Sequence, residues 1–325
     1  MLGALLAFAS AAFFGLNNAT IRRGVLKGSV LQAMAVTVPL GIPLFIVFAV
    51  FMDGFTALED WSLDAWMWMV LAGVVHFVIG RYGNYRATQA LGSTLSAPVQ
   101  QLSILIALFL GFQFLGDTVN TVNVVGILLV IVGPMMLMRR RKAAVSRGKE
   151  KGFEPQYLAG MVWGVICAIG YGTSPLFIAF GLGAEGTLAD STAGVLVSYV
   201  AASIVVVLLV LAAGGRTYMA TLDRASFGWF LLSALFVALS QMLRYLALAV
   251  APISVVVPIQ RLSVVFRLIF NAALNREHEI LDTWVIGSIL LSVLGAAAVA
   301  TDTQVLLGLF GLSDALVGLL SAPLF

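Results

Sequence analysis

The chain has 325 residues, of which 61% are hydrophobic and only 10% are charged, and its mean hydropathy is +1.05. A soluble domain carries about 25% charged residues, so this composition excludes a soluble globular protein and predicts a protein folded in lipid. The formal net charge of +3 does not indicate nucleic-acid binding, because the Lys and Arg residues lie mostly between apolar runs, where they orient a membrane protein. The single cysteine, Cys167, excludes an intrachain disulfide and a cysteine metal cluster, and we expect it to be a buried small hydrophobic residue.

Ten apolar segments are long enough to cross the hydrocarbon core, which takes about 20 helical residues. The predicted spans are residues 2–21, 30–52, 64–87, 94–115, 119–138, 157–180, 190–213, 225–248, 253–273 and 282–301. Apolar residues run all round these segments instead of alternating with polar ones, which excludes a transmembrane β-barrel. No basic leader precedes the first run, so we expect a retained span and not a cleaved signal peptide. The predicted fold class is an all-α integral membrane protein with ten transmembrane helices.

The second half of the chain repeats the first. Pro98 to Ser103 reads PVQQLS, and Pro258 to Ser263 reads PIQRLS. A basic linker at residues 139–156 separates two units of five spans, residues 1–138 and 157–301. Because five is odd, the second unit enters the membrane from the opposite side, so we predict two inverted five-helix repeats. That arrangement is typical of secondary transporters that work by alternating access.

Charge in the loops predicts the orientation of the spans. The basic residues expected on one face are Arg22, Arg23, Lys27, the linker, Arg216, Arg224 and Arg276, and the acidic residues expected on the other are Asp53, Glu59, Asp60, Asp117, Glu185 and Asp190. The positive-inside rule makes the basic face cytoplasmic and places both termini outside. The hydrophobic tail at residues 302–325 fits an interfacial helix better than an eleventh span, because Asp314 would lie near mid-membrane in a span.

A pattern of single residues recurs in both halves: Tyr-x-Ala near the end of the third span, a proline before the fourth, an acidic residue after it and a glycine in the fifth. Its members are Tyr85, Pro98, Asp117 and Gly126, and then Tyr245, Pro258, Glu277 and Gly287. This pattern resembles the EamA family of the drug/metabolite transporter superfamily over about residues 1–301. The resemblance implies transport of small metabolites such as amino acids or organic acids. It also implies termini in the cytoplasm, which is the opposite of what the loop charges predict.

Polar side chains recur on one face of several predicted spans. They are Arg81, Asn84 and Tyr85 on the third span, Gln100 on the fourth, Gln241, Arg244 and Tyr245 on the eighth, and Gln260 and Arg267 on the ninth. A polar group in hydrocarbon needs a partner or a water-filled cavity. We predict that these faces line a central substrate-binding cavity, in which arginine binds a carboxylate or phosphate and the amides and tyrosines orient it. The alternative is that these groups bond one another and hold the helices together.

Three further residues are candidates. Asn17 on the first span and Ser174 on the sixth occupy matched positions, and Pro175 either interrupts the sixth helix at a substrate site or only kinks it. His76, in the middle of the third span, is a candidate for proton coupling because histidine titrates near neutral pH; the alternative is a structural histidine. Arg261 lies about 100° from the face of Gln260, so we assign it to packing or to a lipid headgroup.

Arginines inside the spans, together with the lack of a carboxylate clearly inside any span, favour a small anionic or zwitterionic substrate of the amino-acid or organic-acid class. The alternative is a lipid-linked or phosphorylated substrate. His76 and His278 are the only histidines and no carboxylate set faces them, which argues against an enzyme; no catalytic residue, metal site or cofactor is predicted. The expected partners are the substrate, membrane lipids and a coupling proton or ion, without nucleic acid. The expected location is the bacterial inner membrane.

Overall fold

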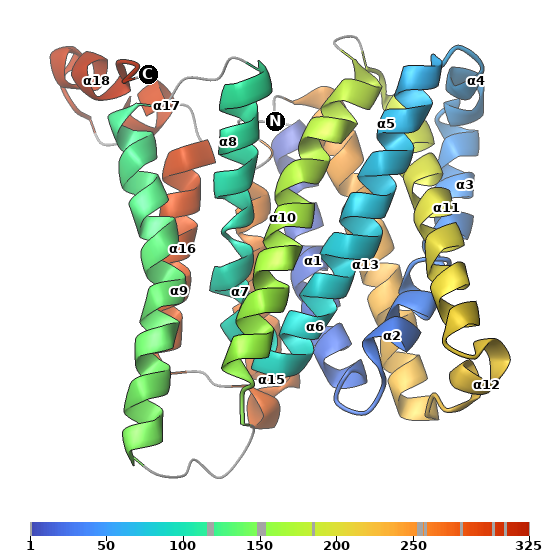
Figure 1. Ribbon diagram of the computed structural model, residues 1–325. Helices are drawn as coiled ribbons and strands as arrows, with labels where there is room; N and C mark the ends of the chain where they lie inside the picture. The colour runs from blue at the N-terminus through green and yellow to red at the C-terminus, as the bar shows by residue number, and fades with distance from the viewer. Residues whose placement is uncertain are drawn as a thin grey trace.

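The computed structural model describes residues 2–115, 120–147, 154–183, 186–251, 256, 259–279, 282–300, 303–308 and 311–324. The regular structure of these residues is helical (Figure 1). In chain order the helices are α1 (Leu2–Gly24), α2 (Val30–Thr37), α3 (Gly41–Phe51), α4 (Gly54–Glu59), α5 (Leu63–Gly73), the π-helix η1 (Val74–Gly80), α6 (Arg81–Leu91), α7 (Ser93–Gln100), α8 (Ser103–Leu115), α9 (Thr121–Arg147), α10 (Tyr157–Leu182), α11 (Leu188–Ala212), α12 (Gly215–Ala220), α13 (Arg224–Val250), α15 (Ser263–Leu274), the 3-10 helix η2 (Arg276–His278), α16 (Thr283–Ala300), α17 (Thr303–Gly308) and α18 (Asp314–Ser321).

Within the described residues, seven helical stretches are long and apolar enough to cross a membrane. They are Leu2–Gly24, Val30–Phe51, Leu63–Leu91, Ser93–Gly111, Tyr157–Leu182, Leu188–Ala212 and Arg224–Val250. Thr121–Val132 and Thr283–Ala298 are shorter apolar helices at the predicted fifth and tenth spans. The predicted ninth span, residues 253–273, lies partly outside the described residues, and α15 covers its second part. The chain is therefore a multi-pass membrane protein, in which seven predicted spans have membrane-crossing length.

The repeated PxQxLS phrase contains a helix break in both halves. In the first half, α7 ends at Gln100 and α8 begins at Ser103. In the second half, the Leu262 N–H donates to the Ile259 carbonyl, and α15 begins at Ser263. This bond joins residues three apart, as does the bond from the Leu102 N–H to the Val99 carbonyl in the first half, and this spacing is tighter than that of an α-helix. The fourth span is therefore a discontinuous helix, which the sequence analysis did not anticipate.

Proline has different effects in the second and sixth spans. The second span is broken between α2 and α3, and Pro39 lies in the break, as expected for a residue that cannot donate a backbone hydrogen bond. In contrast, α10 runs without interruption across Pro175. Of the two alternatives for Pro175, an interruption of the sixth helix is therefore excluded.

The first helix of each half packs against the other half. Helix α1 packs on α13 and α15, whereas α10 packs on α5, η1, α6, α7 and α8 (Figure 1). The end of α1 and the start of α10 lie at the same face, because both contact the end of α6. Arg22 donates to the Thr88 carbonyl, and the Gln156 N–H donates to the Ala90 carbonyl. The first helices of the two halves consequently run in opposite directions.

A close helix contact holds α10 against the π-helix. A Cβ atom built at Gly170 would lie 2.7 Å from the Gly80 Cα, so only glycine permits this approach. Small residues allow close backbone packing between membrane helices. This contact brings α10 beside the segment that carries His76.

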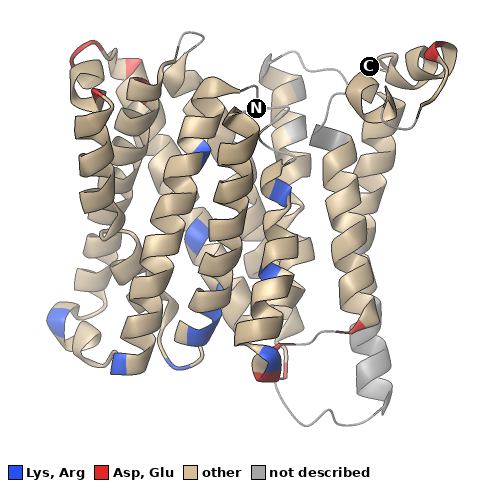
Figure 2. Cartoon of the chain, turned by 180° about the vertical axis from the view of Figure 1, so that it is seen from behind, with Lys and Arg blue, Asp and Glu red and all other residues tan. Residues whose placement is uncertain are grey.

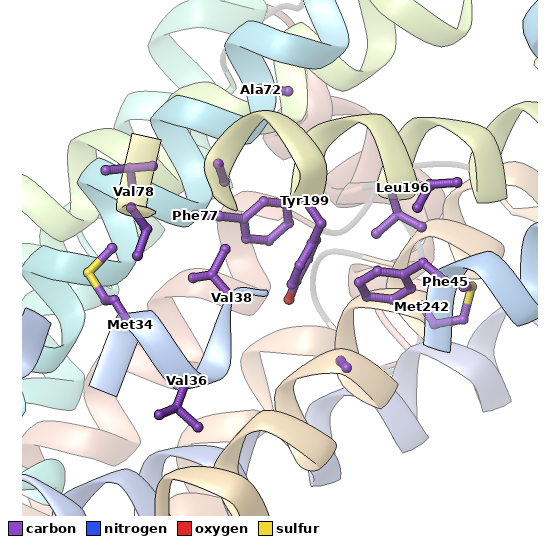
Figure 3. Close-up of a cluster of buried hydrophobic side chains, with 14 of the residues drawn as sticks. Met34, Val36, Val38, Phe45, Ala72, Phe77, Val78, Leu196, Tyr199 and Met242 are labelled. Atoms are coloured by element: carbon purple, nitrogen blue, oxygen red, sulfur yellow. The ribbon is translucent and has the colours of Figure 1, made fainter. Parts of the chain in front are cut away.

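Aromatic packing also supports η1 (Figure 3). The Tyr199 ring of α11 lies 4.5 Å from the Phe45 ring and 4.2 Å from the Phe77 ring, measured between centroids. The surrounding cluster of buried side chains includes Met34 and Met242, from α2 and α13. Residues of both halves therefore form one core around the π-helix.

The described charged residues are unevenly distributed along the molecule. Acidic residues gather at one end, whereas basic residues lie at the other end, together with some acidic residues, and also midway along the helices (Figure 2). Both termini are at the acidic end. Asp117 and Glu185 lie outside the described residues.

The described part of the tail forms two short helices, α17 of 6 residues and α18 of 8 residues. They lie beside the start of α9 (Figure 1), where the Asn120 side chain donates to Thr303 Oγ1 at 2.7 Å. Neither helix reaches the roughly 20 residues that a span requires.

Candidate functional site

A cavity of about 80 Å³ lies between the two halves. Its lining residues are Ser10, Ala11 and Phe14 of α1, His76 of η1, Tyr171 and Pro175 of α10, Ser240, Gln241 and Arg244 of α13, and Gln260, Arg261 and Ser263. Four of the predicted site residues, His76, Gln241, Arg244 and Gln260, meet here. The π-helix presents His76 to the cavity, and such helices often occur at functional sites.

Two arginines give the cavity its charge. Arg244 Nη1 lies 3.5 Å from Gln241 Oε1 and 3.4 Å from His76 Nε2, both long for hydrogen bonds. Arg261 Nη1 donates to Ser103 Oγ at 3.0 Å. The described residues that line the cavity include no Asp or Glu. Both positive charges therefore face the cavity without a carboxylate in its lining.

The contacts of His76 indicate its protonation state. Nδ1 lies 2.6 Å from Ser174 Oγ, and the ring stacks on Tyr171 with centroids 4.4 Å apart. An arginine N–H can only donate, so a lone pair on Nε2 avoids directing two N–H groups at each other. The geometry thus fits neutral His76 with its proton on Nδ1 and donated to Ser174. A second proton would place a positive charge against Arg244.

Arg267 lies outside the cavity lining and is only 2% exposed. Its Nη1 donates to the Ser93 carbonyl at 3.2 Å, and its Nη2 donates to Gln100 Oε1 at 2.9 Å. Gln100 in turn donates to Asn84 Oδ1 at 2.8 Å. These bonds join α15, α7 and α6, which is the bracing role considered as the alternative for the polar faces.

Arg81 is also held by the protein itself. Its Nη2 donates to the Tyr199 hydroxyl at 2.6 Å, and its guanidinium carbon lies 4.9 Å from the Phe77 ring centroid. A guanidinium over an aromatic face is stabilised by the ring quadrupole. Tyr85 donates from its hydroxyl to Thr37 Oγ1 at 3.3 Å. Neither Arg81 nor Tyr85 lines the cavity.

The remaining predicted residues do not line the cavity. Asn84 donates to the hydroxyl of Tyr171 at 3.3 Å, and Ser174 contacts His76. Asn17 Oδ1 accepts from Ser233 Oγ at 2.7 Å, joining α1 to α13. Tyr245 is buried in the hydrophobic cluster around Tyr199. These groups can position the lining residues, but they do not line the cavity.

The sequence analysis missed two features. Arg261, assigned to packing or to a headgroup, lines the cavity. Glu279, which is not among the predicted residues, has its side chain buried 3.1 Å from Arg22 Nε. It also accepts the backbone N–H groups of Ser93 at 2.6 Å and Thr94 at 2.7 Å, at the start of α7. No local pattern in the sequence marks either arrangement.

The comparisons with known proteins agree with this architecture. The model of the EamA-like transporter family matches residues 1–139, which confirms the resemblance over the first half. No curated protein matches the chain. A solved structure titled only "Crystal structure of protein" has a TM-score of 0.56 and 15% identity, and covers 91% of this chain and 95% of that chain. At that identity the match shows a shared fold over nearly the whole length and nothing about function.

Proposed function

We propose, because residues 1–139 belong to the EamA-like transporter family, that this membrane transporter is a secondary transporter of small anionic or zwitterionic metabolites of the amino-acid or organic-acid class. One observation carries the substrate class: Arg244 and Arg261 line a cavity whose described lining has no carboxylate. A charge within the membrane needs a partner, and the anionic group of a substrate supplies one. Planar guanidinium groups suit carboxylate in particular.

The size and polarity of the cavity support a small substrate. At roughly 10–15 Å³ for each water, a cavity of about 80 Å³ holds roughly five to eight waters. The amides of Gln241 and Gln260 and the hydroxyl of Tyr171 supply directional hydrogen bonds beside the two charges. A metabolite with a few polar groups matches this lining.

Transport by alternating access is supported by the arrangement of the halves. We propose ten spans in two inverted five-helix repeats, in the bacterial inner membrane. The cavity takes α1 and His76 from the first half and α10 and α13 from the second, so a movement of one half against the other would change access to it. The break at Leu262 separates the lining residues Arg261 and Ser263, and the break at residues 101–102 precedes Ser103, which accepts a hydrogen bond from Arg261. Both breaks could absorb such a movement.

His76 is the proposed site of proton coupling. The groups that face it are Arg244 of α13, Tyr171 and Ser174 of α10 and, through its charge, Arg81 of α6. A proton on His76 would repel Arg244 and so change the charge presented to the substrate. The negative charge of an incoming anion would offset this repulsion.

The test is uptake of metabolites into proteoliposomes that contain the purified protein. We expect saturable uptake that falls at least tenfold in Arg244→Gln and Arg261→Gln. The matched control is Arg86→Gln, since Arg86 lies outside the cavity, where it donates to Gln89 Oε1 at 2.8 Å. Unchanged uptake in both cavity variants would show that the cavity is not the binding site. No uptake of any metabolite from a broad pool would contradict the transport function.

A further inference from the structure

We infer that the cavity selects a small anion with two negative charges, a dicarboxylate or a phosphate, over a zwitterion. The inference rests on the proposed function and narrows its substrate class. It follows from the two arginine charges of the lining and from the hydrogen-bond donors and acceptors that the lining offers to a ligand.

The fixed charge of the lining favours a dianion. Arg244 and Arg261 are both positive, and His76 is neutral in the geometry observed. Both guanidinium groups belong to the lining of one cavity of about 80 Å³, so their like charges act on each other. One negative group can balance only one of these charges, whereas a dianion balances both. The ammonium group of a zwitterion would add a third positive charge to the same space.

Both arginines retain donors for a ligand. Arg261 lines the cavity, and within the described residues Nη1 is the only nitrogen of its guanidinium with a hydrogen-bond partner. The contacts of Arg244 Nη1, at 3.4 and 3.5 Å, are too long to satisfy that group. Arg261 is anchored through Ser103, and Arg244 stands on the continuous helix α13, so the two cations are held from different elements. Such a pair suits an anion with negative oxygens at both ends.

The described lining offers an ammonium group neutral acceptors only. Ser10 Oγ donates to the Ser240 carbonyl at 2.8 Å, and Ser240 Oγ donates to the Ser10 carbonyl at 2.9 Å. These bonds join α1 to α13 and leave lone pairs on both hydroxyl oxygens. The amide oxygens of Gln241 and Gln260 are further neutral acceptors, and Gln241 Oε1 lies beside Arg244. None of these groups carries the negative charge that would offset an added ammonium group.

Binding of matched small molecules to the detergent-purified protein tests the inference. The probes are malonate, inorganic phosphate and serine at about pH 8 in a buffer without phosphate, measured by titration calorimetry and thermal shift. We expect malonate or phosphate to bind at least tenfold more tightly than serine, because each charge-assisted contact contributes about this factor. Tighter binding of malonate indicates a dicarboxylate, and tighter binding of phosphate indicates a phosphate compound.

Three variants connect the preference to the proposed charges. Arg244→Gln and Arg261→Gln should each weaken dianion binding about tenfold and change serine binding much less. Gln241→Glu adds a carboxylate of nearly the same shape beside Arg244, so malonate should bind more weakly and serine more tightly. Arg86→Gln should bind all three probes as the unaltered protein does.

The outcomes separate this inference from the proposed function. Serine binding as tight as malonate and phosphate binding, together with saturable serine exchange in proteoliposomes, overturns the dianion preference and leaves the transport function standing. The absence of exchange for all three probes and for a metabolite extract overturns the transport function itself. If an arginine variant fails to fold, the comparison of the unaltered protein with Gln241→Glu still decides the preference.

Discussion

Replacing Glu279 with glutamine tests the buried ion pair that joins the loop after α15 to α1 and α7. The Glu279 carboxylate lies 3.1 Å from Arg22 Nε and accepts two backbone N–H groups, at 2.6 and 2.7 Å. Glutamine keeps the shape and one acceptor oxygen but loses the negative charge. The variant therefore leaves the buried Arg22 guanidinium without its carboxylate.

The expected cost follows from these partners. Removing one member of a buried ion pair costs about 3–5 kcal/mol, because the other charge stays buried. Arg22 still donates to the carbonyls of Thr88, Gln89 and His278, at 2.8–3.3 Å, which reduces the penalty. We therefore expect Glu279→Gln to lower the free energy of unfolding by about 3 kcal/mol.

The assay is reversible unfolding by SDS in mixed micelles, followed by tryptophan fluorescence. Glu277→Gln is the matched control, because Glu277 is exposed in the same short segment and should change stability by less than about 0.5 kcal/mol. In the double variant Arg22→Met with Glu279→Gln, the cost should be smaller than the sum of the two single costs. Equal costs for Glu279→Gln and Glu277→Gln would refute the argument.

Two further predictions concern helix packing and proton coupling. Gly170→Ala should destabilise the protein by about 1–3 kcal/mol in the same assay, because the new Cβ would lie 2.7 Å from the Gly80 Cα. The control Gly228→Ala should not destabilise it, because a Cβ there meets nothing within 4 Å, and an equal loss of stability in both variants would contradict the packing argument. His76→Gln should flatten the dependence of transport on external pH, because glutamine keeps polar contacts near Arg244 but cannot take up a proton; an unaltered pH profile would exclude His76 as the coupling site.

Regular helices explain which parts of the cavity were predictable. Gln241 and Arg244 were expected on one face, and both line the cavity because α13 runs unbroken from Arg224 to Val250. Counting 100° per residue from Gln260 did not give the observed positions of Arg261 and Arg267 relative to the cavity. A turn at Leu262 interrupts the helix between them, so a constant 100° step does not relate their directions.

Glu279 shows a second limit of prediction from the sequence alone. A short run of charged residues between two apolar segments normally indicates a solvated loop. Here the burial of its carboxylate depends on Arg22 and on the first N–H groups of α7, which are distant in the sequence. Only a fold that brings these three segments together makes that carboxylate a buried partner.

The sequence by itself determined that the protein is a helical membrane protein, because apolar content and segment length are sufficient to select lipid as the solvent. It also located the polar faces on continuous helices, since helical spacing is a local property. The tertiary structure decided which arginines face the cavity and which brace the helices. That outcome depends on helix breaks and on contacts between halves, so Arg261 faces the cavity while Arg267 is bound by Ser93 and Gln100.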